Sequence, residues 1–113
     1  MNNEQRQALE KKIVRGTIRR LKEAGFLATQ VWDGGEYVKV RTEEEVLEAV
    51  FSVDDSTVHF DGGKGENKHS HGVLFILGNG CDVISDYHCG DPEFDAAMDQ
   101  VNAWVNGLEQ VAS

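Results

Sequence analysis

The sequence predicts one α+β domain in which a mostly antiparallel sheet packs against an N-terminal and a C-terminal helix. The prediction rests on two amphipathic segments at the ends of the chain and on five β-prone runs between them, separated by turn residues and one short helix. The expected order is αββαβββα over residues 1–113. A chain of this length buries a core without a disulfide or a metal.

The first helix is expected over residues 4–24, because apolar side chains recur there at spacings of three and four. Gly25 is the C′ residue that ends it, and Phe26 is placed to pack back on its last turn. We weigh two interpretations of the opposite face: a solvated surface that balances an acidic body, or a docking face for an acidic partner. That face carries Lys11, Lys12, Arg15, Arg19 and Lys22.

A β-hairpin is expected next, with strands over residues 26–32 and 36–41 around the turn Asp33-Gly34-Gly35. Trp32 ends the first strand beside this turn. Core packing is one interpretation of Trp32, and an interface anchor is the other, since tryptophan is enriched among binding hot spots.

A short second helix follows from the segment Thr42 to Glu45, which has the S/T-x-x-E form of a capping box. Its acidic side chains are expected to face water, and Glu44 and Glu48 are the ones we assign to partner contact as the alternative. The buried stripe is expected to be Val46, Leu47, Val50 and Phe51, and the water-facing group Glu43, Glu44, Glu45 and Glu48.

Three further strands are expected over residues 57–60, 73–77 and 82–88, with a polar loop over 61–70. Gly78-Asn79-Gly80 predicts a tight hairpin turn between the last two. If Asn79 and Gly80 form its two-residue centre, residues whose numbers sum to 159 face each other.

The last helix is expected over 92–110, with Asp91 as its N-cap and Pro92 at its first position. Trp104 is expected to contribute most to the side that seals the sheet. That side consists of Met98, Val101, Trp104, Val105 and Leu108.

No segment has the pattern of an enzyme active site. The glycine-rich run 61–65 lacks the spacing and the following helix of a phosphate-binding loop, and Ser85 lacks a G-x-S-x-G elbow. Cys89 precedes a helix N-terminus, where thiols become reactive, but His88 points to the opposite sheet face. We therefore interpret Cys89 as an inert thiol and expect a protein that is not an enzyme.

Histidines provide the one candidate metal site. In the register above, His71 lies opposite His88 with His69 as a diagonal neighbour, and three histidines make a zinc site, with Asp86 as a further ligand. By residue type alone, His59, Cys81 and Cys89 are also candidate ligands. Cys81 and Cys89 lie about 26 Å apart along an extended strand and are expected to be free thiols. No cofactor is expected, and zinc is the alternative.

Charge is divided unevenly along the chain. The net charge of −9 combines +4 over residues 1–25 with −13 over residues 26–113. Such an acidic body repels phosphate backbones, so direct nucleic-acid binding is not expected. The complementary halves predict a weak homodimer. The chain has no long apolar run and no signal-peptide pattern, so we expect a cytoplasmic protein without a membrane partner.

Three segments carry a resemblance to known proteins. They are residues 32–38 (WDGGEYV), residues 50–55 (VFSVDD) and the pair 77–80 (LGNG) with 82–87 (DVISDY). The chain resembles a loose family of small uncharacterised acidic proteins carried by bacterial phages, prophages and plasmids. The resemblance implies an accessory protein of a mobile genetic element and assigns no catalytic residue.

We therefore expect a small, acidic, non-enzymatic binding protein that engages a basic protein partner, in one version as a mimic of DNA. The alternative is a metal-binding protein that uses His69, His71 and His88. The residues expected to contact a partner are Lys12, Arg15, Arg19, Trp32, Glu44 and Glu48.

Overall fold

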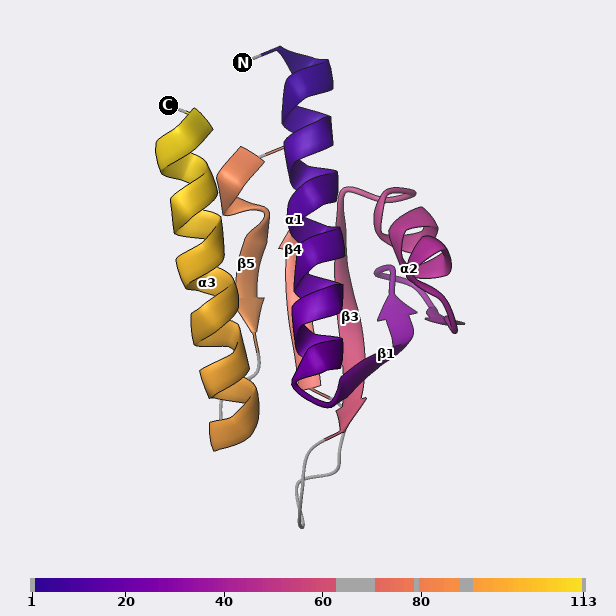
Figure 1. Ribbon diagram of the computed structural model, residues 1–113. Helices are drawn as coiled ribbons and strands as arrows, with labels where there is room; N and C mark the ends of the chain where they lie inside the picture. Colours follow the sequence, from indigo (N-terminus) through magenta and orange to yellow (C-terminus); the bar gives the residue numbers. More distant parts are fainter. Residues whose placement is uncertain (1, 63–70, 79, 88–90, 113) are drawn as a thin grey trace.

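Five antiparallel strands form one sheet in the order β2-β1-β3-β4-β5 (Figure 1). The structure is a computed structural model that describes residues 2–62, 71–78, 80–87 and 91–112. The predicted α+β class and the order αββαβββα are confirmed. The strands are β1 (Phe26–Trp32), β2 (Tyr37–Lys39), β3 (Asp55–Gly62), β4 (His71–Ile76) and β5 (Ile84–Tyr87).

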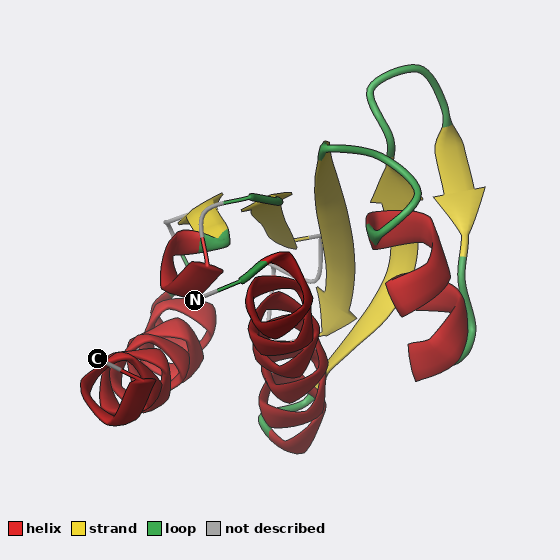
Figure 2. Cartoon of the chain, turned by 90° about the horizontal axis from the view of Figure 1, so that it is seen from above, coloured by secondary structure: helices red, strands yellow, loops and turns green. Residues whose placement is uncertain are grey.

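The α-helices of the described chain lie on one face of this sheet (Figure 2). Helices α1 (Asn3–Glu23) and α3 (Pro92–Ala112) run side by side, and the short α2 (Glu43–Val50) packs beside α1 over β1 and β3. A single 3₁₀ turn, η2 (Gly80–Asp82), precedes β5. None of the described segments covers the opposite sheet face.

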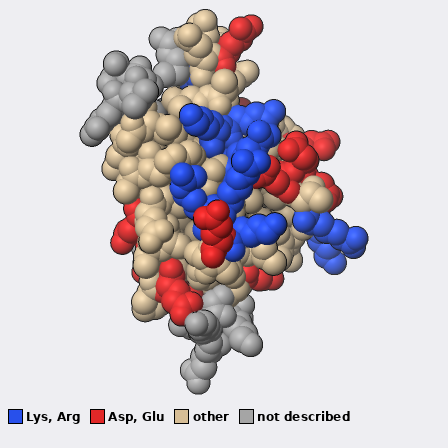
Figure 3. All heavy atoms as spheres, in the orientation of Figure 1, with Lys and Arg blue, Asp and Glu red and all other residues tan. Residues whose placement is uncertain are grey.

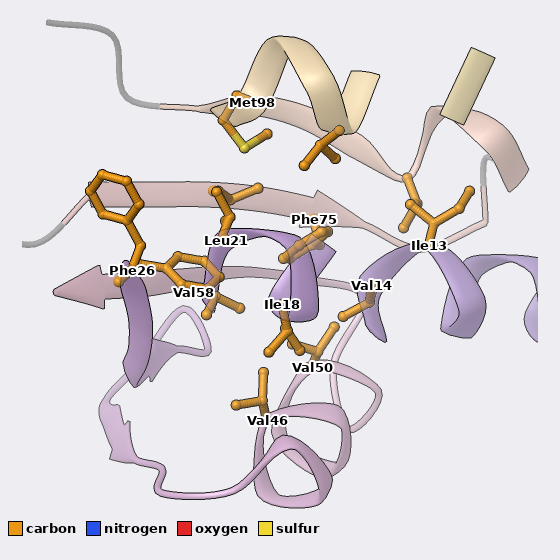
Figure 4. Packing of buried hydrophobic residues seen from close by; sticks show 14 of the residues in the cluster. Ile13, Val14, Ile18, Leu21, Phe26, Val46, Val50, Val58, Phe75 and Met98 are labelled. Carbon is orange, nitrogen blue, oxygen red and sulfur yellow. The ribbon is translucent and has the colours of Figure 1, made fainter. Parts of the chain in front are cut away.

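The core fills the space between the sheet and the helices (Figure 4). Side chains of α1 and α2 interdigitate with those of the sheet, and Met98 of α3 completes the cluster. Among the largest fully buried side chains are Phe26, Phe60, Phe75, Phe94, Ile13 and Leu21. Burial of this apolar area drives the helices onto the sheet.

Helix α1 ends as the sequence predicts. Gly25 has φ +99°, a conformation that glycine adopts at little cost, and Phe26 beyond it is fully buried. At the other end the Asn2 carboxamide oxygen accepts the Gln5 backbone N–H at 2.8 Å, and the Gln5 side chain accepts the Asn2 N–H at 3.1 Å. The observed bounds differ from the expected ones by one residue at each end.

Two details of α2 differ from the expectation. The Thr42 hydroxyl accepts the Glu45 N–H, as in a capping box. The Glu45 carboxylate, however, accepts the backbone N–H of Arg41 at 3.2 Å, one residue before the Thr42 N–H that a capping box would use. Glu43 does not face water freely: its side chain is 23% exposed because it contacts cations of α1. Val46, Leu47 and Val50 are buried as expected.

The predicted register between β4 and β5 is wrong over most of its length. Phe75 pairs with Ile84 as predicted, but Leu74 pairs with Asp86 and Val73 with Tyr87, one residue beyond the predicted partners. An irregularity between Leu74 and Phe75 adds one residue to β5. The connection includes η2 in place of a two-residue turn. The predicted pairing of His71 with His88 lies outside the described residues.

Helix α3 begins as expected and differs in the role of one side chain. The Asp91 carboxylate accepts the Glu93 N–H at 3.0 Å, which confirms Asp91 as the cap. Met98, Val101 and Val105 are buried, but Trp104 is only partly buried. Its indole packs on α1 at Gly16, because glycine there leaves room for the ring.

Candidate protein-interaction surface

The basic face of α1 is partly occupied by contacts within the chain. The Arg19 guanidinium donates to both carboxylate oxygens of Glu43, at 2.7 and 3.1 Å. Arg15 lies 3.5 Å from the same carboxylate and 3.6 Å from that of Glu44. Two of the predicted contact residues therefore hold α2 against α1. Glu43 raises the pKa of Arg19, chiefly through this hydrogen bond and then through its charge.

Other predicted contact residues on the helix side are exposed. Lys12 is exposed on α1. Figure 3 shows a band of Lys and Arg side chains over this side of the molecule, with acidic side chains beside it. Glu44 keeps 78% of its side chain exposed despite its contact with Arg15. Glu48 is also exposed, and within the described chain it makes no ion pair.

Trp32 lies on the uncovered face of the sheet and does not belong to the buried cluster. Its indole packs on the ring of Tyr37, with the ring centroids 4.6 Å apart, and the Tyr37 ring lies 5.5 Å from that of His59. Tyr37 is 57% exposed. The three rings therefore form an aromatic row that crosses β2, β1 and β3, in which Tyr37 is exposed and Trp32 and His59 are partly buried.

Strand pairing shows which residues accompany the aromatic row. Directly paired residues lie on the same side of a sheet. One ladder of pairs crosses the whole uncovered face from edge to edge: Tyr37, Trp32, Thr57, Leu74 and Asp86.

Further residues reach the same face through neighbouring pairs. Lys39, Gln30 and His59 form the adjoining row. Asp55 pairs with Ile76, and Asp61 pairs with Leu27, which is 53% exposed. The uncovered face therefore combines exposed apolar side chains with the carboxylates of Asp55, Asp61 and Asp86 against the ammonium of Lys39.

His59 has its pKa lowered by this position. Partial burial in the sheet disfavours the imidazolium form, and the nearby Asp61 carboxylate opposes that effect only in part. The imidazole is therefore biased toward its neutral form. Neutral His59 adds no positive charge to the uncovered face.

His71 occupies a different environment from the other sheet histidine. It is 3% exposed, and its Nε2 lies 2.8 Å from Oδ2 of Asp91, the residue that caps α3. Its ring stacks on Phe94 at 4.7 Å and meets the edge of Phe26 at 5.2 Å. The geometry makes His71 part of the packing that fixes the start of α3.

The predicted zinc site is not tested by the structure. His69 and His88 lie outside the described residues. Within the described part of the chain, no group of three or more His, Cys, Asp or Glu side chains is placed to hold a metal ion, and Asp86 lies on the uncovered sheet face. The metal-binding alternative stays a prediction.

A hollow lies between α1 and the segments that follow α2 and β4. It measures about 650 Å³ and is lined by side chains of both charges. Glu10, at 1% exposure, accepts the backbone N–H groups of Gly78 at 2.7 Å and Gly80 at 3.0 Å. Its carboxylate therefore holds the connection between β4 and β5 in place.

Sequence reasoning identified Trp32 but missed Tyr37 and His59. The turn Gly34-Gly35 carried the signal for Tyr37, because a two-residue turn centred there pairs Tyr37 with Trp32, as observed. No local signal places His59, whose position depends on the pairing of β1 with β3.

Comparisons with known proteins give no relative for this chain: no family model, no curated protein and no solved structure matches it. In the described residues no helix has both the length and the apolar character needed to span a membrane.

Proposed function

We propose that the chain is a non-enzymatic protein-binding module that engages a basic protein partner on the uncovered face of its sheet. The observation that carries the proposal is the aromatic row Trp32, Tyr37 and His59 on a face that none of the described helices covers. Tryptophan and tyrosine supply a large share of the binding energy in protein interfaces.

Charge favours a basic protein over a nucleic acid. Aromatic side chains on a sheet face also stack on the bases of single-stranded RNA or DNA. Such surfaces add cations that contact the phosphates. Among the paired strand residues that the structure describes on this face, Asp55, Asp61 and Asp86 supply three carboxylates and Lys39 is the one Lys or Arg. The net charge of −9 adds long-range repulsion of polyanions and attraction of basic partners.

The basic face of α1, on the helix side, is a less suitable partner-binding surface than the uncovered sheet face. Arg15 and Arg19 already pair with Glu43 and Glu44, so a partner that used them would have to break contacts within the chain. A role in a mobile genetic element and a weak homodimer both stay predictions.

Selection from a random peptide library tests the proposal. The immobilised chain is expected to enrich peptides of net positive charge, with retention falling as ionic strength rises from about 50 to 300 mM. Tyr37→Ser is expected to abolish enrichment, and the control Lys12→Ala, on the helix side, is expected to retain it. Enrichment of neutral or acidic peptides, or loss of enrichment in Lys12→Ala but not in Tyr37→Ser, would overturn the proposal.

A further inference from the structure

We infer that the partner binds as an extended segment that adds a strand to the outer edge of β2 and places a Lys or Arg side chain in the pocket between β2 and α2. The inference rests on the proposed function and specifies how the basic partner is bound. Three observations carry it: the orientation of the β2 backbone, the pocket beside it, and the carboxylate of Glu48.

The backbone of β2 presents unused hydrogen-bonding groups on its outer side. Asp33 N–H donates to the Glu36 carbonyl at 3.2 Å, and Val40 N–H donates to the Thr29 carbonyl at 3.0 Å. In an antiparallel pair, residues alternate between those that bond to the neighbouring strand and those that point away from it. Val38 therefore bonds to β1, while the N–H and C=O groups of Tyr37 and Lys39 point outward.

No other described segment covers that edge. All residues of β2 are exposed, and no hydrogen bond from the described part of the chain reaches the outward N–H groups of Tyr37 and Lys39. An added strand would satisfy these groups with ordinary ladder bonds. Such bonds require an extended peptide backbone and no particular side chain.

A pocket of about 330 Å³ lies next to this edge on the helix side. Val38, which is 37% exposed and belongs to the helix side of β2, forms part of its wall together with Val40 and Ala49. The full lining consists of Asp33, Val38, Lys39, Val40, Glu45, Glu48, Ala49 and Ser52. An apolar wall with several carboxylates suits the long aliphatic stem and charged end of Lys or Arg.

Glu48 is the carboxylate best placed to receive that charge. Asp33 already accepts the N–H groups of Gly35 and Glu36, both at 2.9 Å, and these bonds lower its pKa. Glu45 caps α2. Glu48 is exposed, and no Lys or Arg of the described chain forms an ion pair with it.

Strand alternation predicts the pattern of the bound segment. The side chain opposite Val38 enters the pocket, and the side chains before and after it lie on the uncovered face. One of these contacts the Tyr37 ring and is expected to be apolar. The other lies opposite Lys39 and is expected to be polar.

A second copy of the chain is a poorer occupant of the same edge. Pairing two β2 edges would bring two acidic pockets together between molecules that each carry −9. Like charges placed opposite each other across an interface cost binding energy. A basic segment of another protein meets no such repulsion.

The probe for the test is a short synthetic peptide of alternating arginine and valine, blocked at both ends. NMR on the labelled chain is expected to show the amide N–H groups of Tyr37 and Lys39 becoming protected from hydrogen exchange when the peptide is added. When arginine lies opposite Val38, the valine N–H groups are the ones that face β2. A matched peptide with its valine nitrogens methylated therefore cannot form the ladder and is expected to give no protection.

Charge reversal tests the pocket. Glu48→Lys is expected to raise the Kd of the arginine–valine peptide by at least about tenfold, which corresponds to about 1.4 kcal/mol. Glu23→Lys, an exposed change of the same charge at the end of α1, is expected to leave the Kd within about twofold. Glu48→Gln repeats the test without adding a cation, in case the reversed charge disturbs α2.

The outcomes separate this inference from the proposed function. Protection of Tyr37 and Lys39 together with a weaker Kd in both Glu48 variants supports strand addition. Three outcomes would overturn strand addition alone. They are peptide-induced shifts confined to Trp32 and His59, an unchanged Kd in the Glu48 variants, and failure of this peptide to bind a chain that still enriches other basic peptides. Failure to enrich any basic peptide would overturn both.

Discussion

The indole ring of Trp104 in α3 occupies the space where residue 16 of α1 would carry a Cβ atom. A Cβ built on Gly16 would lie 2.1 Å from Cη2 of Trp104. The guanidinium carbon of Arg20, one turn further along α1, lies 3.8 Å from the centre of the same ring. The close packing of α1 on α3 therefore depends on the absence of a side chain at residue 16.

Gly16→Ala is expected to destabilise the protein although alanine is the better helix former. The gain in helix propensity is about 1 kcal/mol, whereas moving a packed ring costs about 1 to 3 kcal/mol, and displacing Trp104 also disturbs its contact with Arg20. Gly107→Ala is the matched control, because among the described residues a Cβ there would meet no atom within 4 Å apart from its chain neighbours and the backbone of its own helix. Thermal unfolding should show a lower Tm for Gly16→Ala and a higher one for Gly107→Ala. A higher Tm for both would contradict the packing described.

Glu10→Ala is expected to reduce the free energy of unfolding by about 2 to 3 kcal/mol. The change leaves the N–H groups of Gly78 and Gly80 without their carboxylate acceptor. Glu10→Gln keeps an oxygen acceptor and should lose less. Urea unfolding gives the free energies, and Glu4→Ala, an exposed change on the same helix, serves as the control. Faster hydrogen exchange at Gly78 and Gly80 should accompany the loss, and equal stability of the Glu10→Ala and Glu4→Ala chains would refute this role.

The bond between Arg19 and Glu43 is expected to contribute little to stability. Arg19 keeps 63% of its side chain exposed, and exposed ion pairs are weakened by solvent and salt. A double-mutant cycle of Arg19→Ala and Glu43→Ala should give a coupling energy that is small beside the effect of Glu10→Ala and that decreases with added salt. A large coupling that salt leaves unchanged would show that this contact is more strongly shielded from solvent than its exposure indicates.

His59 is expected to make the folded chain less stable at mildly acidic pH. Partial burial lowers its pKa in the folded chain, whereas the unfolded chain keeps the ordinary value of about 6.5. The unfolded chain therefore binds more protons, so the contribution of His59 to stability is complete above about pH 6.5 and is lost as the pH falls through the folded pKa. Urea unfolding of the native chain and His59→Gln at about pH 7.5 and 5.5 isolates this effect. On going from pH 7.5 to 5.5, the native chain should lose more of its free energy of unfolding than the His59→Gln chain does. An NMR titration that places the His59 pKa above its ordinary value would contradict the sign.

Local sequence patterns were sufficient for the elements and for one strand pair. The cap residues Asp91 and Thr42 locate the starts of two helices, because their side-chain oxygens accept backbone N–H groups of the first turn. Gly25 locates the end of α1, because glycine adopts a positive φ at little cost. The two-residue turn Gly34-Gly35 likewise determines that Trp32 faces Tyr37.

Contacts between distant segments were not predictable in the same way. Register irregularities between Ala28 and Gln30 and between Leu74 and Phe75 shift strand partners without any marker in the sequence. Arg19 and Glu43 belong to separate helices, so their pairing follows only from the packed fold. The candidate site was therefore predicted at Trp32 and Glu48, while the surroundings of both became visible only in the structure.

Tryptophan fluorescence tests most directly whether a basic partner binds the uncovered sheet face. The chain has two tryptophans, Trp32 on that face and Trp104 between α1 and α3. Trp104→Phe leaves Trp32 as the only reporter, and Trp32→Phe leaves Trp104. Titration of both variants with a basic peptide enriched by the native chain should shift the Trp32 emission to shorter wavelength, because the partner displaces water from the indole, and should leave the Trp104 emission unchanged. A shift of Trp104 emission with none at Trp32 would place the binding site on the helix side and contradict the account.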